Sequence, residues 1–323
     1  MLQRFARVLA AAAPAVFCLA ALAQDFPGRP VRIVVPYAPS GNIDITARTL
    51  SQPFSEALGQ PVIIENRAGA GGTMGTGFVA KAPADGYTLL LGSSGTVTAG
   101  PAVYKNLPYD ATRDLVPVGA IQSVPMVLTA GPGTPVANFR ELLAYAKSKG
   151  GPLSMASAGS GSSNHLALEL FAREAHLQVL HVPYKGSGPA LIDLLGGQVE
   201  TMIDQMSSSI EHIRGGRLKV LAVTSLRRSP QLPNVPTLDE LGVTGFEAST
   251  FSGLFAPTGT PPAVLEKLQL ALKKALSIES VRERYRSMGV EMMDMSPAEF
   301  AAFVRADLEK WRKVARDANI VLD

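Results

Sequence analysis

Residues 32–50 read RIVVPYAPSGNIDITARTL, and the order of residue types in this stretch indicates the fold class. Ile33–Tyr37 is a short apolar run of the kind that forms a buried strand. Ala38–Asn42 is a turn of small residues, and the pattern from Ile43 to Arg48 favours a helix. A buried strand that leads through a short turn into a helix is the repeating unit of an α/β protein.

The same order of strand and helix recurs along most of the chain. Strands are predicted at Val31–Tyr37, Val62–Glu65, Thr88–Leu91, Leu153–Ala156, Val179–Val182, Thr201–Asp204, Leu218–Thr224 and Phe251–Phe255. Helices are predicted at Asn42–Leu58, just before Lys81, at Phe139–Lys149, Asn164–Ala175, Pro189–Leu195, Ile210–Arg214 and Ala263–Leu276, and from a capping box at Ser296–Glu299 to about Ala318. Because the strands are almost continuously apolar, we expect parallel sheets covered by helices on both faces. Two βαβ groups separated near Val116–Pro125 predict two lobes.

The N-terminal segment has the pattern of a secretory signal peptide. Arg4 and Arg7 precede an apolar run at Leu9–Leu22, and Ala21–Ala23 has the small-x-small pattern of a cleavage site. The apolar run is too short and wrongly flanked for a membrane-spanning anchor helix, which is the alternative reading. We therefore predict a signal peptide over residues 1–23, cleavage after Ala23, and export to the periplasm. The single cysteine, Cys18, lies within this segment, so the mature chain has no disulfide.

The charge balance argues against a nucleic-acid partner. The net charge is +3, and it falls to +1 once Arg4 and Arg7 are removed, because residues 1–23 contain no acidic residue. No run of Lys and Arg is longer than two residues, and no second apolar run reaches the ~18 residues that a membrane span needs. We expect a soluble, exported monomer that binds no nucleic acid.

Motifs for metal, cofactor or nucleophile chemistry are missing from the sequence. The four histidines, at 165, 176, 181 and 212, do not have the spacing of a metal site, and neither a G-x-S-x-G elbow nor a phosphate-binding loop is present. Gly75–Ala80 fits G-x-G-x-x-A, but it lacks the preceding strand of a dinucleotide site and is interpreted as close helix packing. The sequence therefore predicts no catalytic residue, no metal and no cofactor.

Small polar turns follow four of the predicted strands, at Ala38–Asp44, Gly92–Thr96, Gly159–His165 and Tyr184–Gly188. In open α/β sheets, ligands bind beyond the carboxyl ends of the strands, so two turns from each lobe are expected to face one cleft. Helix starts there carry unpaired N–H groups and a partial positive charge, which favour an anion. Lys185 is the only cation nearby, so the site suits carboxylates and also neutral amides. A single turn of this kind is an ordinary connector, but four together favour a binding site.

Seven stretches, in order from residue 30 to about 261, resemble one known family. They read PVRIVVPYAPSGNIDITAR, VIIENRAGAGGTMGT, ADGYTLLLGSSGT, GSGSSNHLALELF, HVPYKGSGPALIDLLGGQV, IRGGRLKVLAVTSLRRSPQLPNVPTLDELG and FSGLFAPTGTP. The chain resembles the Bug-type periplasmic solute receptors of tripartite tricarboxylate transporters. The first loop differs from the usual family loop, because Ala38 and Ser40 replace one Pro and one Gly.

The resemblance implies a two-lobed periplasmic-binding-protein (Venus flytrap) fold of the α/β class, each lobe a mainly parallel sheet flanked by helices. Lobe 1 would comprise residues 24–125 plus 249–323, with C-terminal helices that reach lobe 2, and lobe 2 would comprise residues 126–248. The family commonly binds a small carboxylate, partly through ordered waters, and works with membrane transporter subunits or a sensor.

The turns and the resemblance together give the candidate substrate-binding set. Its members are Tyr37, Ala38, Ser40, Gly41, Asn42, Ile43, Asp44, Ser93, Ser94, Thr96, Ser162, Ser163, Asn164, His165, Tyr184, Lys185, Gly186 and Asp204.

The same residues are compatible with two other functions. An exported hydrolase or lyase acting on a small carboxylic acid would use His165 or Lys185 as its base. The sensing lobes of a transcription regulator are disfavoured by the signal peptide and by the lack of a DNA-binding segment. For the receptor, mono- and dicarboxylates, amino acids, aromatic acids and uncharged amides all remain candidate ligands.

Overall fold

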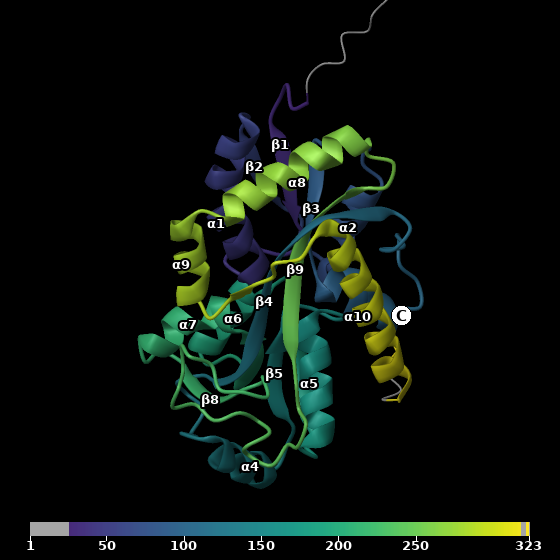
Figure 1. Cartoon of the computed structure of the whole chain (residues 1–323). Coiled ribbons are helices and arrows are strands. Elements are labelled where there is room, and N and C mark those ends of the chain that lie inside the picture. Colours follow the sequence, from purple (N-terminus) through teal and green to yellow (C-terminus); the bar gives the residue numbers. More distant parts are fainter. Residues whose placement is uncertain (1–25, 318–320, 323) are drawn as a thin grey trace, which may run out of the picture.

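Two sheets that share one long strand form the framework of the molecule in the computed structural model, which describes residues 26–317 and 321–322 (Figure 1). The shared strand is β4 (Leu115–Ala130). The predicted signal peptide and its cleavage site lie outside the described residues. The elements around the first sheet described below are called lobe 1, and those around the second sheet are called lobe 2.

The first sheet has the order β2–β1–β3–β9–β4. Its strands are β1 (Val31–Val35), β2 (Val62–Asn66), β3 (Thr88–Ser93), β9 (Ser249–Pro257) and the first part of β4, to which the short β10 (Glu291–Met292) is added. β1 pairs in parallel with β2 and β3. β9 pairs antiparallel with β3 and with β4.

The second sheet begins on the same strand, in the order β4–β7–β5–β6. Its other strands are β5 (Leu153–Ser157), β6 (Val179–Pro183), β7 (Thr201–Gln205) and β8 (Lys219–Val223), which pairs with β4. β5 pairs in parallel with β6 and β7, whereas β4 is antiparallel to β7 and β8.

The predicted α/β class and two-lobed fold are confirmed, and the crossing strands add antiparallel pairings that the sequence analysis did not predict. The segment Val116–Pro125, predicted only as a separation between groups, lies within β4. β4 tolerates its two prolines because the pairing with β9 shifts register after Pro117, and because Pro125 lies where β4 exchanges β9 for β7 as a partner.

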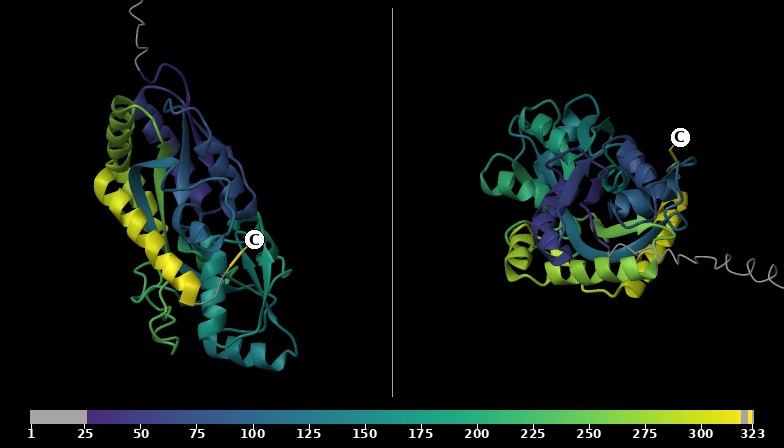
Figure 2. Two further views of the ribbon diagram at one scale, coloured as in Figure 1. Left: turned by 90° about the vertical axis from the view of Figure 1, so that its right-hand side faces the viewer. Right: turned by 90° about the horizontal axis from the view of Figure 1, so that it is seen from above.

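Helices cover both sheets (Figures 1 and 2). In lobe 1 they are α1 (Asn42–Leu58), α2 (Thr73–Ala80), α3 (Gly100–Val103), α8 (Pro262–Leu276), α9 (Glu279–Ser287) and α10 (Pro297–Asp317), with the short turns η1 (Ala70–Gly72) and η2 (Gly95–Ala99). In lobe 2 they are α4 (Phe139–Ser148), α5 (Ser163–Glu174), α6 (Ser187–Leu195) and α7 (Met206–Arg214). The capping box predicted for α10 is present, because Ser296 N–H donates to Glu299 and Glu299 N–H donates to the Ser296 hydroxyl. None of the helices within the described ranges is both long and apolar enough to cross a bilayer.

Successive residues of the central strands pack into different cores, which explains why these strands are almost continuously apolar. Ile33 and Leu91 belong to the core beneath α1 and α8, whereas Val34 and Leu90 belong to the core beneath α2 and α10. Strand side chains alternate between faces, so a sheet covered on both sides needs an apolar residue at each position.

Two crossings connect the lobes, and Thr224 joins them. One crossing is at Pro125–Met126 in β4, and the other is at Ala248–Ser249, where β9 begins. The Thr224 hydroxyl lies 2.8 Å from the carbonyl oxygen of Met126 and 2.6 Å from that of Ala248. The two crossings therefore run side by side, as a hinge would require.

The C-terminal helix adds a third connection between the lobes. Ala315 of α10 packs in one small apolar cluster with Val103 of α3 and Leu166 of α5, and Trp311 packs against this cluster. Figure 2 shows α10 running along the side of the molecule toward lobe 2. α10 therefore contacts α5 of lobe 2.

Candidate functional site

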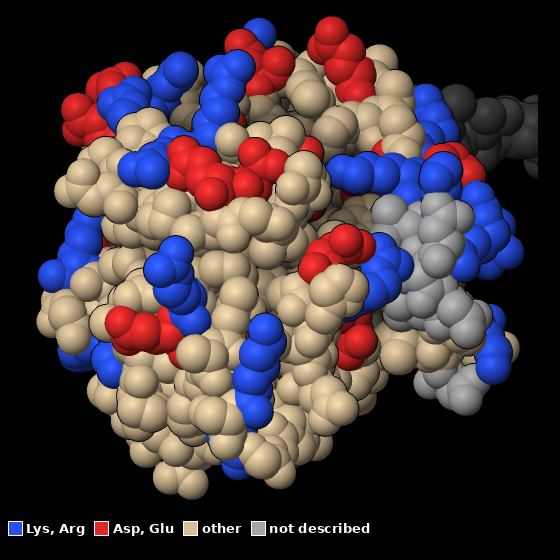
Figure 3. Space-filling model, turned by 90° about the horizontal axis from the view of Figure 1, so that it is seen from below, with Lys and Arg blue, Asp and Glu red and all other residues tan. Residues whose placement is uncertain are grey.

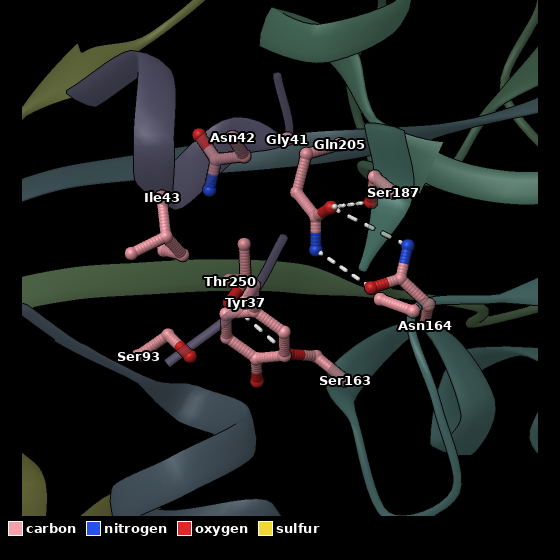
Figure 4. A pocket seen from close by; sticks show the side chains of 11 residues that line it. Tyr37, Gly41, Asn42, Ile43, Ser93, Ser163, Asn164, Ser187, Gln205 and Thr250 are labelled. Atoms are coloured by element: carbon pink, nitrogen blue, oxygen red, sulfur yellow. Dashed lines mark hydrogen bonds between the residues drawn. The ribbon is translucent and has the colours of Figure 1, made fainter. Parts of the chain in front are cut away.

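A cavity with about 300 Å³ of empty space lies between the two lobes (Figure 4). It is lined by Tyr37, Gly41, Asn42, Ile43, Ser93, Ala158, Ser163, Asn164, Ser187, Gln205 and Thr250. All four predicted turns contribute to this lining, so the structure brings residues from both lobes to one place.

Three helices begin at the cavity, and their first turns supply main-chain donors. α1 starts after Gly41, α5 after Ser162 and α6 after Gly186. Neither α1 nor α6 has a side-chain N-cap, whereas the Ser162 hydroxyl accepts from the N–H of His165. The first N–H groups of a helix have no partner within it and carry a partial positive charge. Together these helix starts make the cavity favourable for an anion without a cationic side chain.

Side chains on the lobe 2 wall are held by a buried carboxylate. One oxygen of Asp204 accepts from the Ser187 hydroxyl at 2.6 Å and from the Asn164 amide at 3.0 Å. The other accepts from Ser208 and Ser209 at 2.6 and 2.9 Å. Burial raises the pKa of Asp204, and the four donors only partly offset this effect. Asp204 therefore orients Ser187 and Asn164 from behind the wall rather than facing the cavity.

Asn164 and Gln205 form a reciprocal amide pair on the same wall. The Asn164 Nδ2 donates to Gln205 Oε1 at 3.3 Å, and Gln205 Nε2 donates to Asn164 Oδ1 at 3.2 Å (Figure 4). Each amide thus satisfies the other, which fixes the orientation of both amides at the cavity.

Hydroxyl groups dominate the opposite wall. Burial raises the pKa of Tyr37 to about 12, and a hydrogen bond with Ser93 opposes this shift only partly, so the phenol is neutral at neutral pH. The hydroxyls of Ser163 and Thr250 lie 3.3 Å apart across the two lobes. Hydroxyls can donate or accept, so this wall can offer either hydrogen-bond donors or acceptors to the cavity.

The described residues that line the cavity carry no charged side chain. On the outer surface, Figure 3 shows acidic and basic groups interspersed on the face seen from below, without a large patch of one sign. Within the described ranges, no group of three His, Cys, Asp or Glu side chains has an arrangement that could hold a metal ion.

The lobes touch around the cavity, so this is a closed arrangement. The N–H of Ala38 donates to the carbonyl oxygen of Lys185 at 2.9 Å. Tyr104 of lobe 1 donates its hydroxyl to the Ser160 carbonyl of lobe 2 at 2.7 Å. Gly188 approaches Pro39 so closely that an added Cβ would lie 2.1 Å from the Pro39 carbonyl oxygen.

Seven residues of the predicted set line the cavity: Tyr37, Gly41, Asn42, Ile43, Ser93, Ser163 and Asn164. Three others, Ala38, Tyr184 and Lys185, line a separate, more open groove between the lobes. Lys185, which the sequence analysis predicted as the cation near the site, therefore lies outside the cavity. The role of the whole set in ligand binding stays a prediction.

Asp44 supports the first loop from behind. Its carboxylate accepts from the N–H of Ser40 at 3.0 Å, from Arg48 at 2.9 Å and from Asn66 at 2.9 Å. Burial acts to raise the pKa of Asp44, but these hydrogen bonds outweigh it and lower the pKa below its ordinary value. Ser40 has a φ of +69°, so this carboxylate holds a strained turn in place.

Four further predicted residues build the turns without lining the cavity. Ser94 accepts from the N–H of Phe251, and the Thr96 hydroxyl accepts from the N–H of Ser93. Ser162 caps α5. Gly186 has a φ of +148° and faces Ala38 at the contact between the lobes.

His165 is packed within lobe 2 and does not line the cavity. It is 5% exposed, and its ring stacks on His181 with centroids 4.0 Å apart. Its Nδ1 accepts from the N–H of Gly161 at 3.2 Å, and its Nε2 lies 3.4 Å from Glu169. Burial and the adjacent His165 lower the pKa of His181 to about 4. The pair therefore supports the Gly159–Ser162 turn.

Sequence reasoning missed four lining residues: Ala158, Ser187, Gln205 and Thr250. Ser187 lies in the fourth predicted turn, one residue beyond the set, and Gln205 follows Asp204 at the end of β7. Both positions were within reach of the strand-end argument. Thr250 is at the start of β9, where no turn marks it.

Comparison with known proteins gives one consistent answer. A family model described as "Tripartite tricarboxylate transporter family receptor" matches residues 46–320. The chain is 39% identical to Protein BugT of Bordetella pertussis over 301 residues, which cover 93% of this chain and 92% of that one.

Solved structures agree with the sequence comparison. The periplasmic binding protein BugD is similar with a TM-score of 0.89 and 38% identity, covering 92% of this chain and 99% of that one. The R. palustris protein Rpa4515, solved with adipate, gives 0.88 and 36% over 92% and 99% of the two chains. MatC from Rhodopseudomonas palustris, solved with malate, gives 0.85 and 36% over 90% and 99%.

Proposed function

This chain belongs to the tripartite tricarboxylate transporter receptor family, and from that premise we propose that it captures a small carboxylate in the cavity between its lobes and releases it unchanged. The observation that supports this most is the meeting of three helix starts in one cavity, whose lining has no charged side chain among the residues that the structure describes. Main-chain N–H groups then hold the anion reversibly.

The ligand class follows from the cavity and its relatives. Adipate and malate, named for the two R. palustris structures, are both dicarboxylates. We therefore place small mono- and dicarboxylates first, ahead of neutral amides. The interspersed hydroxyls leave room for ordered waters to complete the contacts.

Capture proceeds by closure at the two crossings. We assign residues 26–125 and 249–317 to lobe 1 and residues 126–248 to lobe 2, because β4 exchanges β9 for β7 between Pro125 and Met126. A ligand that contacts both walls favours the closed arrangement and shifts the population toward it. The receptor would then deliver its ligand, as a monomer in the periplasm, to membrane transporter subunits or to a sensor.

The alternative of an exported hydrolase or lyase gains little from the structure. Its two candidate bases were His165 and Lys185. His165 is committed to the Gly161 N–H and the His181 ring, and Lys185 lines the separate groove. A proposed base must lie within hydrogen-bond reach of the substrate.

A thermal-shift screen of the mature chain tests the proposal. The panel contains adipate, malate, other mono- and dicarboxylates, amino acids, aromatic acids and amides, and hits are verified by calorimetry. A ligand at about 100 times its Kd stabilises the folded state by about 2.7 kcal/mol, a shift that the screen resolves. We expect carboxylates to raise the melting midpoint and to be recovered unchanged. If amides alone stabilise the protein, or if a carboxylate is converted to product, the proposal fails.

A further inference from the structure

The side-chain amide of Asn42 is fixed in one orientation. Its Oδ1 accepts from Gln122 Nε2 at 2.9 Å and from the Ser207 hydroxyl at 2.7 Å. Gln122 Nε2 also donates to the Thr46 hydroxyl at 2.7 Å, so the Gln122 amide is itself held in place. With two donors at its oxygen, the Asn42 amide can direct only its nitrogen toward the cavity.

That nitrogen is buried and has no partner. Asn42 is 3% exposed, and its Nδ2 has no hydrogen-bond partner although it lines the cavity. Figure 4 shows the nitrogen turned toward the other labelled side chains and the oxygen turned away from them. A buried donor without an acceptor is costly, so the group is arranged for an acceptor that the ligand supplies.

The other side-chain amides that line the cavity do not have a donor without an acceptor. Asn164 and Gln205 satisfy one another, and Asn164 also donates to Asp204. The hydroxyls of the walls can reverse their direction. Among the cavity-lining side chains that the structure describes, Asn42 therefore has the one amide donor whose direction is fixed and whose acceptor is missing.

The same amide connects the two lobes. Asn42 is the first residue of α1 in lobe 1, and Gln122 lies in β4, three residues before the crossing. Ser207 is the second residue of α7 in lobe 2 and is 5% exposed. The hydrogen bond between Asn42 and Ser207 therefore joins the two lobes in this structure.

We propose that Asn42 determines ligand specificity, because its Nδ2 donates only to a ligand that places a carboxylate or carbonyl oxygen beside it. The hydrogen bond between Asn42 and Ser207 couples that contact to closure of the lobes. This inference rests on the proposed function. A ligand oxygen that accepts from Nδ2 polarises the amide so that more negative charge lies on Oδ1, which makes Oδ1 a stronger acceptor for Ser207, as in other hydrogen-bond chains.

Three variants and one control test the inference by calorimetry with adipate, malate and every carboxylate that stabilises the wild type in the screen. Asn42→Asp keeps an acceptor for Gln122 and Ser207 but directs an anionic oxygen at the ligand, so we expect carboxylate binding to be lost. Asn42→Ala should weaken binding about 10- to 100-fold, as expected when one hydrogen bond to a charged group is removed. Ser207→Ala removes only the hydrogen bond from Ser207 to Asn42 and should weaken binding about 3- to 10-fold.

Adipamide, the neutral diamide of adipate, makes the test specific for donor direction. Its amide groups can donate as well as accept, so Asn42→Asp should bind it at least as well as the wild type does. The matched control is Gln52→Glu, the same chemical change on the exposed side of α1, which should leave the affinity for every probe unchanged.

The outcomes separate this inference from the proposed function. A wild type that binds no carboxylate refutes the proposed function, and the inference falls with it. If the wild type binds a carboxylate and both Asn42→Asp and Asn42→Ala bind it equally tightly, the inference is refuted and the proposed function stands. If Asn42→Asp does not fold, then Asn42→Ala and Ser207→Ala decide, and unchanged affinity in both overturns the proposal.

Discussion

Replacing Gly188 by alanine should obstruct closure of the lobes without harming either lobe. Gly188 is the second residue of α6, and its φ is not positive, so alanine fits its backbone. The new Cβ would lie 2.1 Å from the carbonyl oxygen of Pro39 in lobe 1, where real Cβ contacts are essentially never under 3.0 Å. Both sides of this contact are backbone, so the lobes must separate by about 0.9 Å here.

The cost of that separation follows from the neighbouring contacts. The 2.9 Å hydrogen bond from Ala38 N–H to the Lys185 carbonyl would lengthen beyond hydrogen-bond range. Losing it, with part of the packing of Gly41 on Ser187, destabilises the closed form by about 1–3 kcal/mol, which raises the Kd about 5- to 150-fold. The open form is unaffected, and alanine stabilises a helix relative to glycine by about 0.5–1 kcal/mol.

Calorimetry with the ligand found in the screen measures the first effect, and thermal melting of the ligand-free protein measures the second. We expect weaker binding together with an unchanged or slightly higher melting midpoint. The control is Gly133→Ala, because a Cβ at this exposed glycine meets nothing within 4 Å. If Gly188→Ala binds as tightly as the control, binding does not need this closed arrangement.

Four further substitutions should have separable effects. Asn164→Ala should weaken ligand binding by about 1–3 kcal/mol in calorimetry, because it removes a wall side chain and leaves Asp204 and Gln205 short of a partner. Asp44→Ala should weaken binding by a similar ~1–3 kcal/mol, since the Ser40 turn loses its acceptor; equal affinity would show that the loop needs no such support. Burial acts to raise the pKa of Glu200, but several hydrogen bonds, chiefly from Lys149, together outweigh it and lower the pKa to about 2. The stability that ionised Glu200 contributes is therefore present above pH 4.5 and is lost toward pH 2. Glu200→Gln should therefore lower the free energy of unfolding by about 1–2 kcal/mol at pH 7, and in denaturant titrations this difference should narrow as the pH falls through that window; a constant difference would contradict the linkage. Thr224→Val should lower the free energy of unfolding by about 1–2 kcal/mol, because the hydroxyl that joins both crossings is lost, and a melting midpoint equal to that of the wild type would contradict this role.

The strand and helix pattern was predictable because local periodicity determines it. Ile33 and Val34 read as a buried strand because each faces a different core, and the structure shows both cores. The α6 and α7 helices begin two and four residues earlier than predicted, at Ser187 and Met206, because small polar residues in a first turn resemble a loop in the sequence.

The long strands β4 and β9 were harder to predict because their role is tertiary. Pro117 and Pro125 break the local strand pattern of β4, and only the bulge and the exchange of partners accommodate them. Thr250 reaches the cavity through the pairing of β9 with β4, which no local signal in the sequence reports.

The candidate site was predictable as a set of turns, but not in the roles of its side chains. Tyr37 and Ser93 lie close together because the parallel strands β1 and β3 end at one edge of the first sheet, and Asn164 follows β5 in the facing lobe. His165 and Asp204 look alike in the sequence as polar residues that follow strands, yet each also has partners 16 to 40 residues away that orient it. Such pairings depend on packing between elements, so the sequence could not separate residues that line the wall from residues that support it.

The continuity of β4 limits how this protein can be recombined. Side chains alternate along a strand, so inserting or deleting one residue near Ile121 would invert one half of β4 relative to the other. Val118 and Leu128, both fully buried, could then not both face their own cores. Chimeras that exchange one lobe with a relative must therefore preserve the residue count through β4, whereas the loop at Gly133 can accept added length.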